Sequence, residues 1–139
     1  MSPTRSAYAD HFATIPDAVA AVGRGEIVVV VDDEDRENEG DLIMAAESAT
    51  PETIAFFVRH TSGVICAPLT GDRLDELEIP LMVRDNTESQ RTAFTYSVDF
   101  RHGTSTGISA ADRAATIRSL IDPATHPGDL ARPGHIFPL

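Results

Sequence analysis

The sequence predicts a layered domain of the α/β or α+β class with a mixed sheet. Segments with helix-start signals alternate along the chain with short apolar segments, as they do where helices cover a sheet. The apolar segments are of two kinds, because residues 26–31 run through β-branched side chains without alternation whereas residues 94–100 alternate apolar and polar ones. The 139 residues, 42% hydrophobic and 24% charged, suit one globular domain. We therefore expect a single domain over residues 1–139, in which residues 1–13 are loosely attached.

The N-terminal part begins with a predicted helix and a predicted strand. Thr14 is a suitable N-cap, with Asp17 three residues later, and Gly23 is a suitable stop, so a helix is expected between them. The strand of residues 26–31 is expected to be covered on both faces, because its apolar side chains do not alternate. Residues 42–46 form a second apolar run.

The middle of the chain predicts a second helix, a further strand and a short polar helix. The second helix is expected over residues 51–60, because a threonine N-cap precedes it and proline occupies its first position. Residues 64–69 are the strand candidate, and Cys66 within it is expected to be a small buried hydrophobe. The polar helix is expected over residues 72–77, with irregular chain after it.

The C-terminal part is expected to hold one more strand and one more helix. In residues 94–100 the apolar side chains at even positions are expected to face the core and the polar ones at odd positions to face solvent. Ser109 and Asp112 form a capping signature for a helix to about Ile121. Residues 122–139 hold four of the nine prolines and are expected to be loop. The chain stops without a further element to seal the sheet, so we expect a C-terminally shortened domain.

Composition excludes several classes of function. The formal net charge of −11, from 22 acidic and 11 basic residues, argues against binding to a phosphate backbone. No stretch approaches the ~18 apolar residues of a spanning helix and no apolar targeting segment begins the chain, so a cytoplasmic protein without membrane partners is expected. The single cysteine cannot form an internal disulfide.

An acidic segment over residues 32–41 is the first candidate site. It holds seven carboxylates and one arginine, and it follows a predicted strand, at the end where open sheets place ligands. One interpretation is a solvated acidic turn. The other is a site for a hard divalent cation such as Mg²⁺, which binds few carboxylates together with water and substrate oxygens.

Two further segments could carry chemistry. Residues 104–109 are rich in hydroxyls and glycine and lead into a capped helix, which would suit a phosphate, although an ordinary N-cap loop has the same composition. His135, framed by proline and glycine, could act as an acid or base or could simply be solvated. His60 and Asp112 are explained as helix-end residues.

Five motifs, taken together, resemble one enzyme family. They are DDEDRENEGDLIMAAE from residue 32, RHTSGVIC from residue 59, DNTE from residue 85, GTSTGISAADRAATIR from residue 103 and RPGHIFPL from residue 132. In this order and at these separations they resemble 3,4-dihydroxy-2-butanone 4-phosphate synthase of riboflavin biosynthesis, over roughly residues 25–139. The resemblance implies a three-layer α/β/α sandwich and a homodimer with active sites at the subunit interface. It also implies Mg²⁺-dependent, or Mn²⁺-dependent, conversion of D-ribulose 5-phosphate to dihydroxybutanone phosphate and formate.

The resemblance also implies roles for individual residues. Glu37 corresponds to a metal ligand that also contacts substrate, Arg36 and Asp41 to contacts with the sugar phosphate, and Glu39 to a participant in proton transfer. The catalytic set implied by the family is completed by Cys66 and His135. Thr104, Thr106 and Ser109 correspond to the loop beside the substrate.

The family pattern continues beyond RPGHIFPL with a segment that carries a second metal-ligating histidine, and this sequence has no counterpart of that segment. A second hypothesis is therefore a non-catalytic truncated homologue that binds a sugar phosphate or metal and acts through a protein partner. A third is an acidic structural domain. Metal-dependent turnover would distinguish the first from the other two, and ligand-induced stabilisation would distinguish the second from the third.

Overall fold

The computed structural model describes residues 11–139, which fall into two compact units, one ending at Ala45 and the other spanning Ala46–Leu139. Residues 1–10, most of the segment predicted to be loosely attached, lie outside the described residues. The fold is α+β and contains a mixed sheet, as predicted. None of the helices within residues 11–139 is long and apolar enough to cross a membrane.

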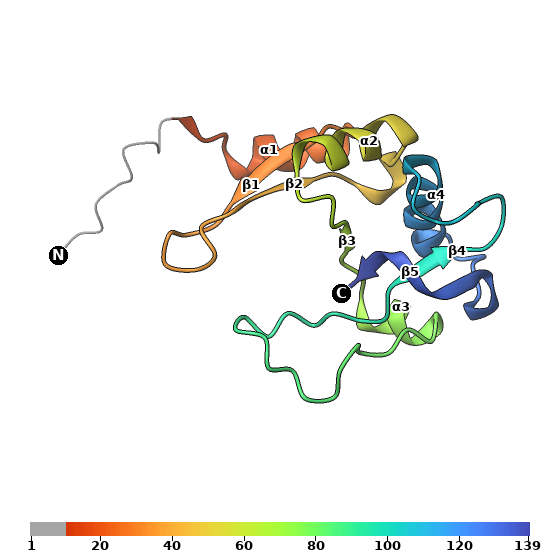
Figure 1. The fold of residues 1–139 in the computed structure, drawn as a ribbon. Helices are drawn as coiled ribbons and strands as arrows, with labels where there is room; N and C mark the ends of the chain where they lie inside the picture. The colour runs from red at the N-terminus through yellow and green to blue at the C-terminus, as the bar shows by residue number, and fades with distance from the viewer. Residues whose placement is uncertain (1–10) are drawn as a thin grey trace. The chain divides into compact units, whose positions relative to one another are not determined.

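The first unit consists of a helix and a hairpin (Figure 1). Helix α1 (Ile15–Gly23) begins where the sequence predicts, with the Thr14 hydroxyl accepting from the backbone N–H of Asp17. Strands β1 (Val28–Val31) and β2 (Gly40–Ile43) pair antiparallel, and the acidic segment is the loop that joins them.

The prediction that the first strand is covered on both faces is wrong. Val29, on one face of β1, is 68% exposed, and Val30, on the other, is 45% exposed. Within this unit the sheet has only two strands, and α1 has no buried residue, so no layer encloses the hairpin. In this chain the four consecutive valines therefore form an exposed hairpin strand, in keeping with the β-propensity of β-branched residues.

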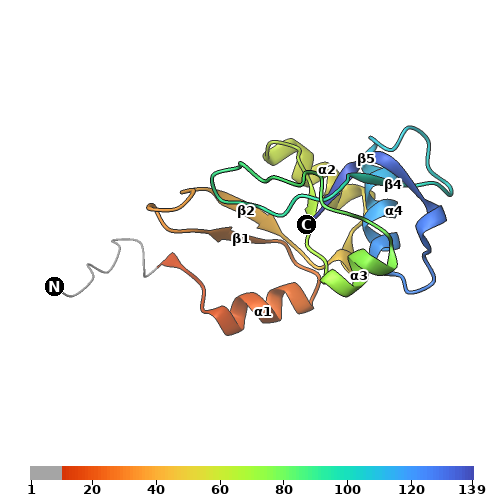
Figure 2. The same ribbon diagram turned by 90° about the horizontal axis from the view of Figure 1, so that it is seen from below.

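The second unit is built around a three-stranded sheet in the order β3-β5-β4. Strand β3 (Cys66–Ala67) runs parallel to β5 (Leu130–Pro138), and β4 (Val98–Phe100) runs antiparallel to it. Helix α4 (Ala110–Ile121) packs on β4 and β5, and α2 (Pro51–His60) packs on α4, as Figures 1 and 2 show. The buried core lies among these elements and comprises Ala49, Ile54, Ile65, Leu77, Ile79, Val98, Ala114, Ile117, Leu120, Leu130 and Ile136.

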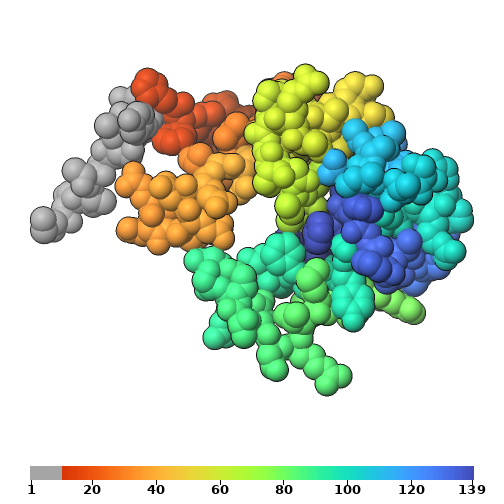
Figure 3. Space-filling view, in the orientation of Figure 1, coloured from red at the N-terminus to blue at the C-terminus, as the bar shows by residue number. Residues whose placement is uncertain are grey.

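Short helices and a long connection complete this unit. They are η2 (Ala46–Ser48), α3 (Gly71–Glu76) and η3 (Pro127–Asp129). Between α3 and β4, residues 80–96 form an arm whose two sides are joined by a bridge between Leu81 and Thr95. Figure 3 shows this arm, in green, standing away from α2 and α4.

The prediction of loop over residues 122–139 is wrong, because β5 is the central strand of the sheet. Its prolines are placed where a strand tolerates them. Pro133 falls in an irregular stretch opposite β4, and Pro138 ends the strand, where its carbonyl accepts from the backbone N–H of Thr95 at 3.1 Å. A high proline count therefore does not distinguish loop from a strand with an irregular middle.

Two further burial predictions are wrong, the second of them in part. Cys66 is exposed, because β3 is a two-residue edge strand, and the neighbouring Ile65 is buried in its place. In residues 94–100 Val98 is buried as predicted, but the polar positions 95, 97 and 99 are buried as well, and Tyr96 is 45% exposed. The reason is that the polar side chains bind β5: Thr95 Oγ1, for example, donates to the carbonyl of Pro138 at 2.6 Å.

Candidate functional site

The acidic loop of the first unit is organised by one of its carboxylates. Asp32 accepts from the backbone N–H of Glu37 at 3.0 Å and from that of Glu39 at 2.9 Å. Arg36 reaches the same carboxylate with Nε at 3.0 Å and Glu37 Oε2 with Nη2 at 2.9 Å. The loop is therefore closed by hydrogen bonds across its base and is not an unstructured acidic turn.

These contacts stabilise the charged form of Asp32. The backbone N–H groups of Glu39 and Glu37, with a smaller contribution from the Arg36 guanidinium, hold the pKa of Asp32 below its usual range. Asp41 is exposed on β2 opposite Val30. Arg36, Glu37, Glu39 and Asp41, four of the predicted site residues, thus form one group within the first unit, on and beside a short hairpin.

His135 lies in an irregular stretch of β5 in the second unit. Between β4 and β5, Asp99 pairs with Ala131 and Val98 pairs with Ile136. Residues 132–135 of β5 therefore bulge out between two consecutive positions of β4. Proline and glycine in this stretch predicted a loop, and the structure corrects this to a bulge inside a strand. Bulges are one of the ways in which a strand re-aims a side chain.

Glycine is needed in this bulge because the two strands touch there. A Cβ at Gly134 would stand 2.0 Å from the carbonyl carbon of Val98 and 2.3 Å from the nitrogen of Asp99. The N–H of Gly134 donates to Ser97 Oγ at 3.1 Å. The buried polar side chains of residues 97 and 99 therefore satisfy the backbone of the bulge that carries His135.

The imidazole of His135 is paired with Asp99. His135 Nδ1 lies 2.7 Å from Asp99 Oδ2, and the backbone N–H of His135 donates to Oδ1 of the same carboxylate at 2.8 Å. Asp99 is only 8% exposed, whereas the side chain of His135 is 40% exposed. One carboxylate thus fixes both the backbone and the ring of the histidine and leaves the ring accessible.

Residues 104–109 form a compact loop around a second carboxylate. Asp112 Oδ2 accepts from Ser105 N at 3.2 Å, Ser105 Oγ at 2.8 Å and Gly107 N at 3.0 Å. Ser109 caps α4 by accepting from the N–H of Asp112 at 3.0 Å, as predicted. The carboxylate of Asp112, however, organises the loop instead of returning to the cap, which corrects its interpretation as part of a capping box.

The hydrogen bonds to Asp112 stabilise its charged form. The Ser105 hydroxyl, followed by backbone N–H groups of the loop, lowers the pKa of Asp112. The Thr104 hydroxyl donates to the carbonyl of Phe100, and Thr106 is exposed. The N–H groups of Ser105 and Gly107 are therefore already bound to a carboxylate, and the exposed hydroxyl of Thr106 remains for a ligand.

The loop of residues 104–109 and the histidine meet at Asp99. Gly107 has a φ of +88° and lies against the Asp99 side chain, so that a Cβ at position 107 would stand 1.9 Å from Oδ2. The second unit therefore brings together His135, Asp99 and the loop that contains Thr104, Thr106 and Ser109. Cys66 lies beside Phe137 on the neighbouring strand, with its side chain exposed.

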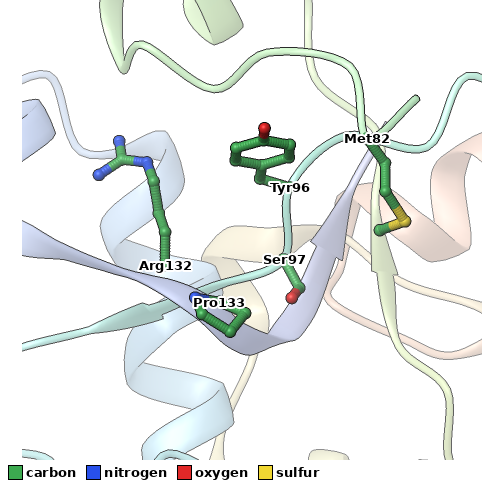
Figure 4. Close-up of a pocket in the computed structure, with 5 residues that line it drawn as sticks. All are labelled: Met82, Tyr96, Ser97, Arg132 and Pro133. Carbon is green, nitrogen blue, oxygen red and sulfur yellow. The ribbon is translucent and has the colours of Figure 1, made fainter. Parts of the chain in front are cut away.

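A pocket of about 280 Å³ opens beside the bulge (Figure 4). It is lined by Met82, Tyr96, Ser97, Arg132 and Pro133. The Arg132 guanidinium donates to three backbone carbonyls, those of Pro127 at 3.0 Å, Leu130 at 3.2 Å and Leu77 at 2.5 Å. Arg132 is thus engaged in holding the ends of α3 and η3 to β5, and the apolar wall of the pocket is formed by the base of the arm.

Asp99 is the site residue that sequence reasoning missed. It was assigned to the solvent-facing side of an alternating strand. The signal that points to it is the recurrence of threonine, serine and aspartate at alternate positions of one short strand, since three polar side chains in such a row can bind an irregular neighbouring strand. Register with residues 132–135 is needed to recognise the partner.

Within residues 11–139 the structure contains no group of three or more histidine, cysteine, aspartate or glutamate side chains placed to hold a metal ion. Glu37 offers a single carboxylate, one oxygen of which accepts from Arg36. One carboxylate fits the way Mg²⁺ is bound when water and substrate oxygens supply the remaining ligands. The donor set of the first unit is thus compatible with such an ion and does not by itself enclose one.

Comparisons with known proteins agree on one family. The family profile described as 3,4-dihydroxy-2-butanone 4-phosphate synthase matches residues 16–139. The protein of that name from Agrobacterium fabrum is 61% identical over 127 residues, which are 91% of this chain and 60% of that protein. A monofunctional riboflavin biosynthesis protein RIBA 2 of Arabidopsis thaliana, described as chloroplastic, is 59% identical over 132 residues, 94% of this chain and 28% of that one.

Solved structures give the same result. A crystal structure of 3,4-dihydroxy-2-butanone 4-phosphate synthase in complex with two magnesium ions matches with a TM-score of 0.90 and 55% identity, covering 92% of this chain and 60% of that one. A cation-free form matches with a TM-score of 0.84 and 53% identity, covering 92% and 59%. The chain therefore spans about 60% of the length of these relatives.

Proposed function

The chain belongs to the 3,4-dihydroxy-2-butanone 4-phosphate synthase family of riboflavin biosynthesis, and from this premise we propose that it converts D-ribulose 5-phosphate to 3,4-dihydroxy-2-butanone 4-phosphate and formate. The observation that carries the proposal is the accessible imidazole of His135, held by Asp99 beside the loop of residues 104–109. A base next to a hydroxyl-rich loop is what enolisation of a sugar phosphate requires.

The reaction begins with removal of a proton from the carbon beside the ketone. In the proposal, His135 accepts that proton at Nε2, since Nδ1 is occupied by Asp99. Glu39, on the acidic loop, and Cys66, with its exposed thiol, are proposed to take part in the later proton transfers that accompany the carbon shift and the release of formate. No external oxidant or reductant is needed, because the sugar carbons are redistributed between the two products.

Each polar loop offers groups that a sugar phosphate could engage. Arg36 offers a guanidinium, which can exchange its present carboxylate partners for a phosphate. Asp41 would accept from sugar hydroxyls, and so would the exposed hydroxyl of Thr106, with Thr104 and Ser109 shaping the loop. The resemblance implies a contact with the substrate for each of these groups, and the proposal adopts these roles.

Glu37 is the proposed protein ligand to Mg²⁺ or Mn²⁺. A relative is described in complex with two magnesium ions, and the single carboxylate of Glu37 suits a site completed by water and substrate oxygens. The ion, when bound, supplies positive charge beside the oxygen atoms that become negative during enolisation. The proposal also includes a C-terminally shortened three-layer sandwich and a homodimer with active sites between its subunits. Size-exclusion chromatography with light scattering would test the dimer.

Formate release is the experiment that tests the proposed activity. Formate would be measured from D-ribulose 5-phosphate with Mg²⁺, with Mn²⁺ and with the metal chelated, using protein whose folding is checked by circular dichroism. Metal-dependent formate supports the synthase. Folded protein that is stabilised by the sugar phosphate but releases no formate would replace this proposal with that of a non-catalytic binding homologue, and an absence of both effects would leave an acidic structural domain.

A further inference from the structure

The ring of His135 is held by a buried partner, Asp99, and the choice of Nε2 as proton acceptor in the proposal above depends on the tautomer that this partner selects. Asp99 Oδ1 is taken by the backbone N–H of His135, and Oδ2 lies 2.7 Å from the ring nitrogen Nδ1. Since an ionised carboxylate can only accept, the hydrogen of a neutral ring facing it must be on Nδ1. The lone pair is then on Nε2, the nitrogen that faces away from Asp99.

We propose that Asp99 is a positioning residue for His135, which selects the Nδ1–H tautomer and so makes Nε2 the proton acceptor. Its importance for turnover rests on the proposed function, whereas the tautomer can be tested without substrate. Three observations support a built arrangement. Asp99 is buried, the bulge needs glycine at position 134, and Gly107 packs directly on the carboxylate.

Replacing Asp99 by asparagine should change the tautomer of His135, because the two contacts of residue 99 with His135 determine how the new amide is oriented. The backbone N–H of His135 is a donor and requires the amide oxygen where Oδ1 now is. The amide nitrogen, a donor, must then face Nδ1, which can only respond as an acceptor. Asp99→Asn should therefore keep the backbone contact and the shape of the site while it moves the ring hydrogen to Nε2.

A second pair in the chain provides a matched control. His102 Nε2 lies 2.7 Å from Asp129 Oδ1, so there the carboxylate faces the other ring nitrogen and favours the opposite tautomer. Asp129→Asn removes a carboxylate from a histidine in the same unit without touching Asp99, Gly107 or His135. It should change the signals of His102 and leave those of His135 as they are.

The test is a long-range ¹H–¹⁵N correlation spectrum of the histidine rings, recorded at alkaline pH where the imidazole is neutral. In the unmodified chain His135 should show a protonated Nδ1 and an unprotonated Nε2, and Asp99→Asn should exchange the two shifts. Formate release by Asp99→Asn should fall at least about 100-fold in kcat, with KM unchanged, because the acceptor nitrogen is protonated.

The outcomes separate this inference from the proposed function. Protonated Nε2 in the unmodified chain, or unchanged ring shifts in folded Asp99→Asn, would overturn the assignment of Asp99. The first of these needs no variant, so the test stands even if Asp99→Asn fails to fold. If the unmodified chain shows the expected ring shifts but releases no formate, the tautomer assignment is supported and the synthase activity is rejected. If it releases formate but Nε2 is protonated, the synthase activity is supported and the role of Asp99 is rejected.

Discussion

The backbone of Gly107 lies against the carboxylate of Asp99 so closely that a Cβ on Gly107 would stand 1.9 Å from Asp99 Oδ2. Gly107 also has a φ of +88°, which a residue with a side chain adopts at a cost. We expect Gly107→Ala to lower the free energy of unfolding by more than the roughly 1–3 kcal/mol of backbone strain alone, measured by urea denaturation.

Two other glycines allow the contribution of backbone strain to be separated from that of the contact with Asp99. Gly103 has a φ of +70° but no atom within 4 Å of its Cβ position, so Gly103→Ala reports the backbone strain alone. Gly128 has neither feature, and Gly128→Ala should stay within about 0.5 kcal/mol of the parent protein. Equal losses for Gly107→Ala and Gly103→Ala would mean that the contact with Asp99 has no energetic weight.

Gly134→Ala should be more damaging than Gly107→Ala. Its Cβ would meet the main chain of Val98 and Asp99 at 2.0–2.3 Å, and a main chain in a sheet cannot rotate away as a carboxylate can. We expect the β4–β5 pairing to open, seen as faster amide exchange at Thr95 and Arg101, whose backbone N–H groups donate to the carbonyls of Pro138 and Asp129. Unchanged exchange at both residues would show that the bulge accommodates a Cβ at position 134 without opening the sheet.

Local signals in the sequence predicted the helices well. Thr14, Thr50 and Ser109 are the N-caps of α1, α2 and α4, because capping depends on side chains within three residues of the helix start. The central strand was missed because Pro133 and Gly134 are read locally as loop residues. What makes that stretch a strand is pairing with residues more than 30 positions earlier, and local patterns do not carry such pairing.

In the candidate site, too, some residues could be found from local motifs and others only from the pairing of strands. The motif resemblance identified His135 and the loop of residues 104–109, and the structure brings these together. Asp99 was missed because its burial follows from what β5 needs, not from its own alternating pattern. For the same reason Cys66, in an apolar run, was expected to be buried but lies exposed on a two-residue edge strand. Long-range strand register thus decided whether Asp99 and Cys66 are buried or exposed.

Glu37→Gln is expected to weaken Mn²⁺ binding about tenfold or more, because it replaces the proposed metal-ligating carboxylate by a weak neutral ligand. The hairpin should remain folded, since its closure depends on Asp32. Electron paramagnetic resonance of free Mn²⁺ gives the affinity directly. Glu34→Gln removes the same charge from the same loop, and an equal loss in both variants would mean that only net charge attracts the ion.

His135→Ala should reduce formate release about 10²–10⁴-fold while it leaves D-ribulose 5-phosphate binding unchanged, because it removes the proposed base and none of the proposed phosphate contacts. Isothermal titration calorimetry checks the binding. The control is His60→Ala, at the exposed C-terminal end of α2, which should leave formate release at the parent level. Undiminished release by His135→Ala would remove His135 from the proposed mechanism.

The arm of residues 80–96 should have an acid-stable tip. Glu88 accepts from the backbone N–H groups of Gln90 and Thr92 at 2.9–3.0 Å and from Ser89 Oγ at 2.9 Å. These bonds, the backbone N–H of Gln90 first among them, lower the pKa of Glu88 from 4.5 to about 2.

Because the pKa of Glu88 is lower in the folded arm than in the unfolded chain, its charged form stabilises the tip fully above pH 4.5. That stabilisation should be lost progressively as the pH falls from 4.5 through about 2. Amide proton shifts of Gln90 and Thr92, followed against pH, should therefore hold their downfield positions at pH 4 and move only in stronger acid. In Glu88→Gln the same two amides should lose this titration altogether. A midpoint near 4.5 in the parent protein would mean that the hydrogen bonds to Glu88 do not persist in solution.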